Sequence, residues 1–211
     1  MRAPTLIPLA AALLLAACTK SEAPPAAPDP TPSAAAPAAT PTPTPTAAPM
    51  VIKDAQGQVI LRITPREAGA YRLEDAKGEK IGKITVEPDR VKVKDASDAP
   101  RAKVKKKDNG FKLYAADEQV VFKGKLSGES KLKLKREDET EIGAFEGAAG
   151  HVGGVQVAAR PVTGGVEVSV GGQVKYTIEG TIGAEPAALL AAPDLDLYQQ
   201  AALLIFVKEV W

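Results

Sequence analysis

The fold is decided by a stretch of sixteen residues, Tyr71-Arg-Leu-Glu-Asp-Ala-Lys-Gly-Glu-Lys-Ile-Gly-Lys-Ile-Thr-Val86. It opens on alternating apolar and polar residues, passes through Asp-Ala-Lys-Gly, and then becomes extended again. Alternation places the apolar side chains on one face of a strand, and Asp and Gly are residues that tight turns favour. The stretch therefore predicts a β-hairpin.

The same pattern recurs along the chain at a spacing of about 20 residues. Five predicted hairpins open at residues 50, 71, 91, 111 and 132. Turn residues that join one hairpin to the next are found at 65–69, 87–89, 108–110 and 127–128. Three further strands, Gly-rich and nearly uncharged, are expected at 152–159, 166–170 and 174–182. The sequence thus predicts a mainly β fold, an antiparallel meander of about twelve or thirteen strands.

The alternation also assigns the two faces of the predicted sheet. Val91 and Val93 point to one side, and Lys92 and Lys94 point to the other. A sheet with one apolar face must close on itself, pack on a second sheet, or cover a plug.

A candidate plug lies at the end of the chain, in residues 184–211. We expect a short helix at 185–191, then Asp194 as a capping residue, and a second helix over 195–211. Its apolar core is Leu203, Leu204, Ile205, Phe206 and Val207. A helix that is apolar around most of its circumference belongs in an interior. A membrane span is a weaker interpretation, because the segment is shorter than the ~20 residues that a span requires. Docking on a surface or on a partner protein is the other alternative.

Residues 50–211 resemble the superfamily of tubby C-terminal, LURP-one and phospholipid-scramblase domains. The resemblance is carried by hairpin units such as 71–82 and by the tail Leu203-Leu-Ile-Phe-Val-Lys-Glu-Val210. It implies a twelve-stranded barrel closed around a hydrophobic C-terminal helix. The chain has no counterpart of the scramblase cysteine-rich and calcium-binding segments or of the phosphoinositide-binding residues of tubby proteins, so fold is implied and activity is not. A free-standing Lys/Glu-rich sheet, like that of some spirochaete surface lipoproteins, is the alternative architecture.

The N-terminus carries an export signal over residues 1–17. A positive start is followed by the apolar run Leu6–Leu15 and then by Ala16 and Ala17, before Cys18, the one cysteine of the chain. These residues resemble the lipobox of bacterial lipoproteins, which implies cleavage before Cys18 and acylation of that residue. With Thr19 in place of an Asp, the resemblance implies a lipid anchor in the outer membrane. An ordinary secretory signal is the alternative.

Residues 18–49 are expected to form a disordered tether between the lipidated cysteine and the folded domain. Residues 21–49 contain ten Pro, ten Ala and five Thr, a composition that builds no core. Such a chain favours extended polyproline II. A docking peptide for a partner that reads proline is the alternative.

Cationic residues concentrate in the middle of the predicted barrel. Between Arg101 and Arg136 there are twelve Lys or Arg and four acidic residues. The residues expected to contact an anionic surface are Arg101, Lys103, Lys105, Lys106, Lys107, Lys131, Lys133 and Lys135. They predict a binding module for anionic lipid or lipopolysaccharide. Alternatively the lysines keep the strands soluble, and the barrel is a structural lipoprotein that binds another envelope protein.

Catalysis, cofactors and metals have little support in the sequence. His151 is the one histidine, is expected in a loop, and lacks the Cys or second His that metal sites and nucleophilic pairs require. The acidic run 137–141 is expected to be a solvated hairpin tip, and the Asp residues at 54, 75 and 95 to be turn residues. We therefore expect a non-enzyme without a cofactor. Nucleic acid is not an expected partner, and no oligomeric state is predicted.

Overall fold

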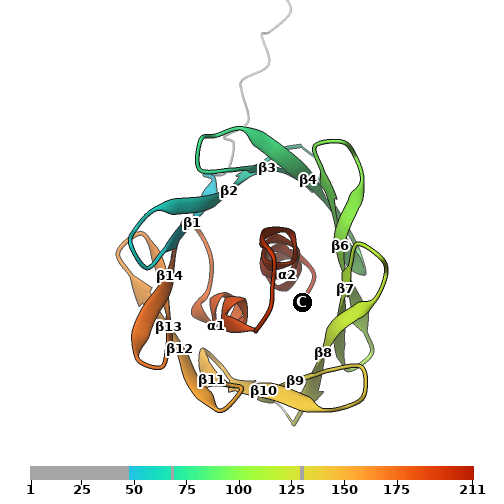
Figure 1. Ribbon diagram of the computed structural model, residues 1–211, viewed down its shortest axis with the longest axis vertical. Coiled ribbons are helices and arrows are strands. Elements are labelled where there is room, and N and C mark those ends of the chain that lie inside the picture. Colours follow the sequence, from blue (N-terminus) through green and yellow to red (C-terminus); the bar gives the residue numbers. More distant parts are fainter. Residues whose placement is uncertain (1–47, 68, 129–130) are drawn as a thin grey trace, which may run out of the picture. The chain divides into compact units, whose positions relative to one another are not determined.

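The computed structural model describes residues 48–67, 69–128 and 131–211. Cys18, the predicted signal peptide and all but the last two residues of the predicted tether lie outside this range. Within it, fourteen antiparallel strands form a closed barrel, in which each strand pairs with its neighbours in sequence and β14 pairs with β1 (Figure 1). The strands are β1 (Met50–Asp54), β2 (Val59–Pro65), β3 (Ala70–Glu74), β4 (Lys80–Glu87), β5 (Arg90–Asp95), β6 (Pro100–Lys107), β7 (Gly110–Ala115), β8 (Val120–Ser127), β9 (Lys131–Lys135), β10 (Glu141–Glu146), β11 (Ala149–Val152), β12 (Val155–Val162), β13 (Gly165–Val170) and β14 (Gln173–Glu179).

The predicted meander is confirmed, and the number of strands is corrected from about twelve or thirteen to fourteen. The stretch predicted as one strand over 152–159 contains a turn at Gly153-Gly154, where both glycines have positive φ. The turn separates β11 from β12. His151 therefore lies in a strand, opposite Ala144 and Gln156, and the loop predicted for it is wrong.

The five predicted hairpins share one loop geometry. At the first tip the Asp54 carboxylate accepts hydrogen bonds from the backbone N–H groups of Gln56 and Gln58, at 3.0 and 2.8 Å. Asp75 and Asp95 each bind the backbone two and four residues ahead in the same way. These aspartates are turn residues, as expected. Because alternate turns of a meander lie at the same end of a barrel, all five tips lie at one end, which we call the tip end.

Each of the five hairpins contains a bulge just after its tip, where the register skips one residue of the second strand. The skipped residues are Ile60, Ile81, Arg101, Val121 and Ile142. Four of them are apolar and pack against the core, so Arg101 is the exception at this position.

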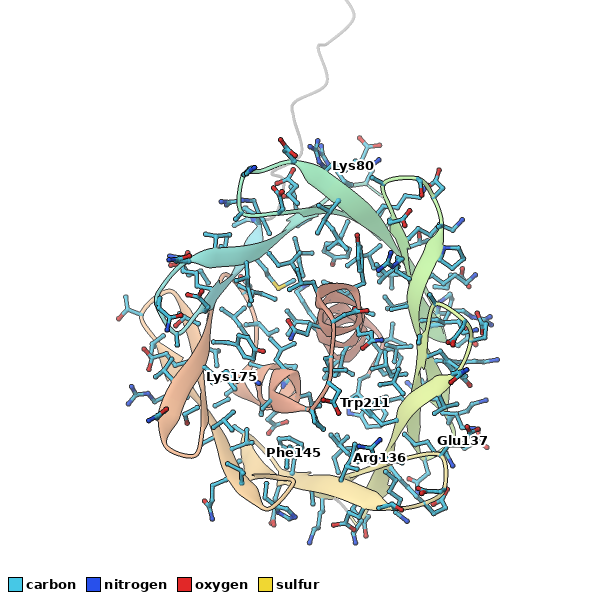
Figure 2. The ribbon with its side chains drawn as sticks, in the orientation of Figure 1. Lys80, Arg136, Glu137, Phe145, Lys175 and Trp211 are labelled. Carbon is cyan, nitrogen blue, oxygen red and sulfur yellow. The ribbon has the colours of Figure 1, made fainter. Side chains whose placement is uncertain are left out.

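The interior of the barrel is filled by the C-terminal region (Figures 1 and 2). It forms α1 (Ala184–Ala188), a 3-10 turn η1 (Leu189–Ala191) and α2 (Leu197–Glu209). The side chains of Leu203, Leu204, Ile205 and Phe206 are fully buried, and Val207 is half-buried. Inward strand residues complete the core, among them Ile63, Leu73, Val93, Val104 and Leu113. Among the described residues, no helix is both long and apolar enough to cross a membrane.

The start of α2 differs from the prediction. The N-cap is Asp196, whose carboxylate accepts a hydrogen bond from the backbone N–H of Gln199 at 2.8 Å. The Gln199 side chain in turn accepts from the backbone N–H of Asp196, which completes a capping box. The predicted cap, Asp194, lies in the preceding loop at φ 59.

Candidate anion-binding surface

The exterior of the barrel carries cationic residues that strand register aligns directly opposite one another. From β5 to β9 the aligned residues are Arg90, Lys105, Lys112, Lys123 and Lys135, which we call the cation row. The row continues into Glu87 on β4 and Glu141 on β10, so an acidic residue stands at each end. Directly opposite residues have Cβ atoms about 4.5–5.5 Å apart, and like charges in such pairs are destabilising.

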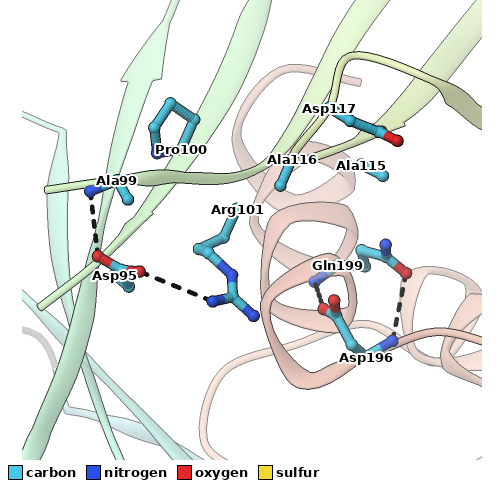
Figure 3. A pocket seen from close by; sticks show the side chains of 9 residues that line it. All are labelled: Asp95, Ala99, Pro100, Arg101, Ala115, Ala116, Asp117, Asp196 and Gln199. Atoms are coloured by element: carbon cyan, nitrogen blue, oxygen red, sulfur yellow. Dashed lines mark hydrogen bonds and ion pairs between the residues drawn. The ribbon is translucent and has the colours of Figure 1, made fainter. Parts of the chain in front are cut away.

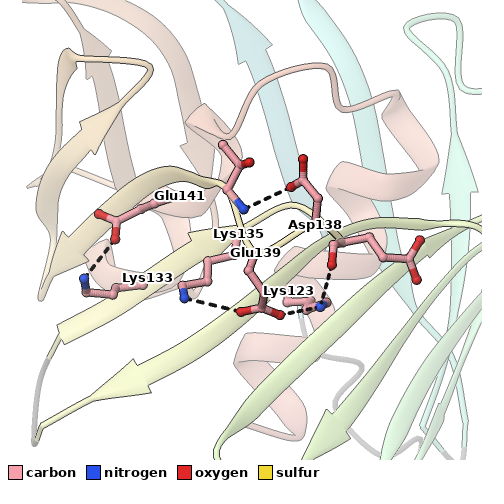
Figure 4. Close-up of polar contacts among 8 residues, drawn as sticks. Lys123, Lys133, Lys135, Asp138, Glu139 and Glu141 are labelled. Carbon is pink, nitrogen blue, oxygen red and sulfur yellow. Dashed lines mark hydrogen bonds and ion pairs between the residues drawn. The ribbon is translucent and has the colours of Figure 1, made fainter.

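The ends of the cation row are paired with carboxylates. Arg90 binds Asp89 at 2.7 Å and Glu87 at 3.3 Å. At the other end, Glu139 binds Lys123 at 2.6 Å and Lys135 at 3.3 Å (Figure 4). These contacts reduce the net positive charge at both ends of the row.

The pKa values of these carboxyl groups reflect the same contacts. The hydrogen bond from Arg90 lowers the pKa of Asp89. Hydrogen bonds from Lys123 and then Lys135 lower the pKa of Glu139, and a hydrogen bond from Lys133 lowers the pKa of Glu141. At neutral pH the three groups are therefore ionised and remain counterions of the cations.

The two lysines in the middle of the cation row differ from those at its ends in their contacts with carboxylates. Over the described residues, neither Lys105 nor Lys112 has a carboxylate oxygen within 4.0 Å of its ammonium nitrogen. Lys105 and Lys112 are directly opposite each other on β6 and β7. Over the described residues, positive charge that no carboxylate within 4.0 Å balances therefore lies over these two strands.

Most of the residues predicted to contact an anionic surface do point outward, but several have partners. Lys103 pairs with Glu118 and lies over the Tyr114 ring, with its ammonium 4.6 Å from the ring centroid. Lys133 pairs with Glu141 at 2.8 Å. Lys135 pairs with Glu139 at 3.3 Å. The other outward members are Lys105 in the row, Lys107 at the end of β6, and the exposed Lys131 at the start of β9.

Two of the predicted residues lie elsewhere. Lys106 is paired in register with the buried Phe111, so it belongs to the inner face. Its ammonium donates to the carbonyl of Val210 at 3.0 Å, where a cation stabilises the C-terminus of α2. Arg101 occupies the bulge of the third hairpin, and its guanidinium lies 4.6 Å from the centroid of the Tyr198 ring of α2. Neither residue belongs to the outer cationic surface.

Arg101 lines a pocket of about 430 Å³ at the tip end (Figure 3). Asp95, Asp117, Asp196 and Gln199 also line it. Three carboxylates of this pocket accept hydrogen bonds from backbone N–H groups, Asp95 and Asp117 in hairpin tips and Asp196 at the start of α2. The polar lining of the pocket is therefore accounted for by turns and a helix cap.

Three members of the cation row, Arg90, Lys112 and Lys123, are not among the residues predicted from the sequence to contact an anionic surface. The sequence did contain information on how part of the cation row is aligned. The two-residue turns 88–89 and 108–109 fix the pairs Glu87–Arg90 and Lys107–Gly110, and from these the outward residues of each hairpin can be aligned. The bulged tips add a residue to each intervening hairpin, and without their geometry the five strands cannot be put in register.

Within the described residues, no group of three or more His, Cys, Asp or Glu side chains is arranged to hold a metal ion. His151 is exposed on β11. The acidic run after Arg136 forms the fifth hairpin tip, where Asp138 accepts a hydrogen bond from the backbone N–H of Thr140 at 3.0 Å (Figure 4).

Comparison with known proteins identifies no family for this chain and one similar solved structure. No family model matches the chain, and no curated protein matches it. Among solved structures, it is similar to the X-ray structure of a protein from Arabidopsis thaliana, with 14% sequence identity and a TM-score of 0.39. The alignment covers 76% of this chain and 83% of that one.

Proposed function

We propose that this protein is a lipid-anchored, non-catalytic binding module of the bacterial outer membrane, whose barrel binds anionic lipid or lipopolysaccharide through the cation row. The observation that carries the proposal is the row itself. Five cations stand opposite one another on five adjacent strands, with no acidic residue between them in register. An arrangement that lowers the stability of a barrel is expected where an anionic partner offsets the repulsion.

The anchor and tether expected from the sequence support the proposal, because they would bring the barrel near lipid. A diacylated Cys18 would hold the chain stably on a membrane, since two acyl chains convert marginal binding into lasting attachment. Extended Pro-rich chain spans about 3.1 Å per residue, so a tether of this composition would hold the barrel near the membrane without pressing it against the surface. Each lysine near an anionic surface contributes roughly 1 kcal/mol at low salt.

The proposal is tested by flotation with vesicles. The full chain with Cys18→Ser is mixed with vesicles of phosphatidylcholine, with or without phosphatidylglycerol. Binding to the anionic vesicles is expected, and it should weaken as salt rises, because exposed charges are screened over about 8 Å at physiological ionic strength. Vesicles of phosphatidylcholine alone measure what the N-terminal segment contributes to binding.

The row is then tested with paired variants. Lys105→Gln with Lys112→Gln removes the two unpaired charges from the middle of the row and should abolish the salt-sensitive binding. The matched control is Lys77→Gln with Lys175→Gln, two exposed lysines of other strands and turns that should leave binding unchanged. Equal binding by both double variants would rule out the row as the lipid-binding surface.

The anchor has a separate test. Cells that express the wild-type chain are expected to incorporate radiolabelled fatty acid into the protein, and Cys18→Ser should remove the label. Labelling that persists in the variant would place the lipid elsewhere.

The second candidate is a scaffold that binds another envelope protein, and the exterior of β11 and β12 favours it. There the outward pairs are Ala149–Ala158 and His151–Gln156, all exposed. This face is small and uncharged, unlike the lysine-rich face of β5–β9. Ala158→Lys should abolish cross-linking to a specific envelope protein and leave vesicle flotation unchanged, whereas cross-linking that survives it excludes this face.

A further inference from the structure

Four lysines lie together on β6, β7 and β8 around a residue without a side chain. Lys105 and Lys112 are directly opposite each other in the cation row. One row further along, Gly110 on β7 stands between Lys107 on β6 and Lys125 on β8. We call Lys105, Lys107, Lys112 and Lys125 the lysine tetrad.

The backbone conformation at position 110 admits only glycine. Its φ is 152°, and a Cβ added there would lie 1.9 Å from the carbonyl oxygen of Gly124. Strand spacing is about 4.8 Å, so the Cα atoms of Lys107 and Lys125 lie about 10 Å apart across β7. With no side chain between them, their flexible four-carbon stems can bring the two ammonium groups together over Gly110.

Within residues 48–67, 69–128 and 131–211, the tetrad forms no ion pair with a carboxylate. Among the described residues, none of its four ammonium groups lies within 4.0 Å of a carboxylate oxygen. By contrast, three other outward lysines of β5, β8 and β9 have partners: Lys92 pairs with Glu87, Lys123 with Glu139 and Lys133 with Glu141. Asp89, whose pKa is lowered first by its hydrogen bond from Arg90 and also by the charge of Lys105, forms a two-point contact with Arg90 at 2.7 and 2.9 Å.

We infer that the lysine tetrad is a site for a phosphate monoester, the doubly charged group that ends some lipid headgroups. This inference rests on the proposed function and narrows its ligand. A monoester carries a charge of about −1.5 to −2 at neutral pH and has three oxygens that accept strong hydrogen bonds, so it can engage several ammonium groups at once. A phosphodiester carries one charge and two free oxygens, and it leaves part of the tetrad unpaired.

Flotation of the full chain with Cys18→Ser tests the inference. Phosphatidic acid vesicles present a monoester and phosphatidylglycerol vesicles present a diester, with the two preparations adjusted to the same zeta potential. The wild-type tetrad is expected to bind phosphatidic acid about tenfold more tightly, the effect of one or two additional charge-assisted hydrogen bonds.

The variant that isolates the tetrad from the row is Lys107→Gln with Lys125→Gln. It should bind both kinds of vesicle equally, at the level that the wild-type chain shows for phosphatidylglycerol. Lys107→Arg with Lys125→Arg keeps the charges and should keep the preference, while Lys77→Gln with Lys175→Gln controls for net charge. An unchanged circular dichroism spectrum and melting temperature establish that each variant is folded.

Inorganic phosphate separates the two sources of the group. If phosphate at matched ionic strength displaces the chain from phosphatidic acid vesicles but not from phosphatidylglycerol vesicles, the tetrad accepts the free anion. If the preference persists without displacement, the tetrad requires the group on a lipid. Equal wild-type binding to both vesicles, or a preference that survives the glutamine variant, overturns the inference and leaves the proposed function standing. Absence of binding to both vesicles defeats the proposed function itself.

Discussion

At the scale of single residues, Lys112 has the least favourable surroundings on the barrel exterior. It stands directly opposite Lys105 on one side and Lys123 on the other. Lys123 is partly neutralised by Glu139, but Lys105 is not paired with a carboxylate among the described residues. Opposite charges in such cross-strand pairs are stabilising and like charges are destabilising, so this residue bears directly on the balance between stability and binding.

Lys112→Glu should therefore stabilise the fold and weaken anion binding. Replacing two like-charge pairs by opposite-charge pairs is expected to raise the free energy of unfolding by about 0.2–1 kcal/mol. A gain of about 1 kcal/mol raises the melting temperature of a domain of this size by about 2–4 °C. Thermal unfolding at low salt measures it, with Lys175→Glu as control because Lys175 has no register partner. A lower melting temperature for Lys112→Glu would contradict the repulsion.

Two residues, Lys106 and Arg101, were wrongly predicted to contact an anionic surface, for different reasons. Lys105, Lys106 and Lys107 are consecutive, so period-two alternation already assigns Lys106 to the face opposite its neighbours. The sequence therefore contained the evidence that Lys106 points inward. Arg101 is different, because its orientation depends on a bulge that shifts the register by one residue, and composition does not reveal a bulge.

At the scale of elements, the five tip hairpins could be predicted because each combines alternation with Asp or Gly at a fixed place. The short strand β11 could not, since Ala149-Gly150-His151-Val152 has no alternating apolar pattern and its turn residues are as common in loops. The helix boundary was also imprecise. Both Asp194 and Asp196 are capping residues by type, and the Gln three residues after Asp196 decides between them.

The start of α2 gives the prediction at this scale. Asp196→Ala removes the carboxylate that accepts from the backbone N–H of Gln199 and should cost about 0.5–2 kcal/mol of stability. Asp194→Asn is the matched control, because Asn tolerates the left-handed conformation at that position and removes the same charge. Urea unfolding measures both variants. Equal losses would mean that charge near the helix start, rather than the capping hydrogen bond, is what stabilises it.

At the scale of the whole molecule, closure of the barrel and burial of α2 depend on each other. Closure leaves no free strand edge, and the lumen must be filled by side chains. Phe206 of α2 is fully buried, with its ring centroid 5.5 Å from that of Phe111 on β7 and 6.1 Å from that of Trp211. This part of the fold was predictable, since an apolar helix and a one-sided sheet each need the other.

Phe206→Ala tests that dependence. Deleting a buried ring leaves a cavity that the surrounding strands cannot fill, and the expected cost is about 3–5 kcal/mol. Val155→Ala is the control, because Val155 is 45% exposed at the turn end of β12 and its truncation leaves no buried cavity. Chemical denaturation followed by circular dichroism measures both. A loss below about 1 kcal/mol for Phe206→Ala would mean that α2 contributes little to the stability of the barrel.

The response of the whole barrel to acid follows from the carboxylates at the end of the cation row. Hydrogen bonds from lysines lower the pKa of Glu139 and Glu141 below the usual 4.5. A lowered pKa in the folded state means that the stabilisation is complete above pH 4.5 and is lost as the pH falls through the folded value. Protonation also releases Lys123 and Lys133, which raises the repulsion along the exterior.

Glu139→Gln should therefore melt below the wild-type chain at pH 7, and the difference should shrink as the pH falls below 4.5, because protonated wild-type Glu139 also lacks its charge. Melting temperatures measured between pH 7 and pH 3 at low salt follow this convergence. Asp108→Asn is the control, since Asp108 forms no ion pair with the described residues. A difference between wild type and Glu139→Gln that stays constant over this range would show that Glu139 acts through packing, and that its ion pairs with Lys123 and Lys135 do not stabilise the barrel.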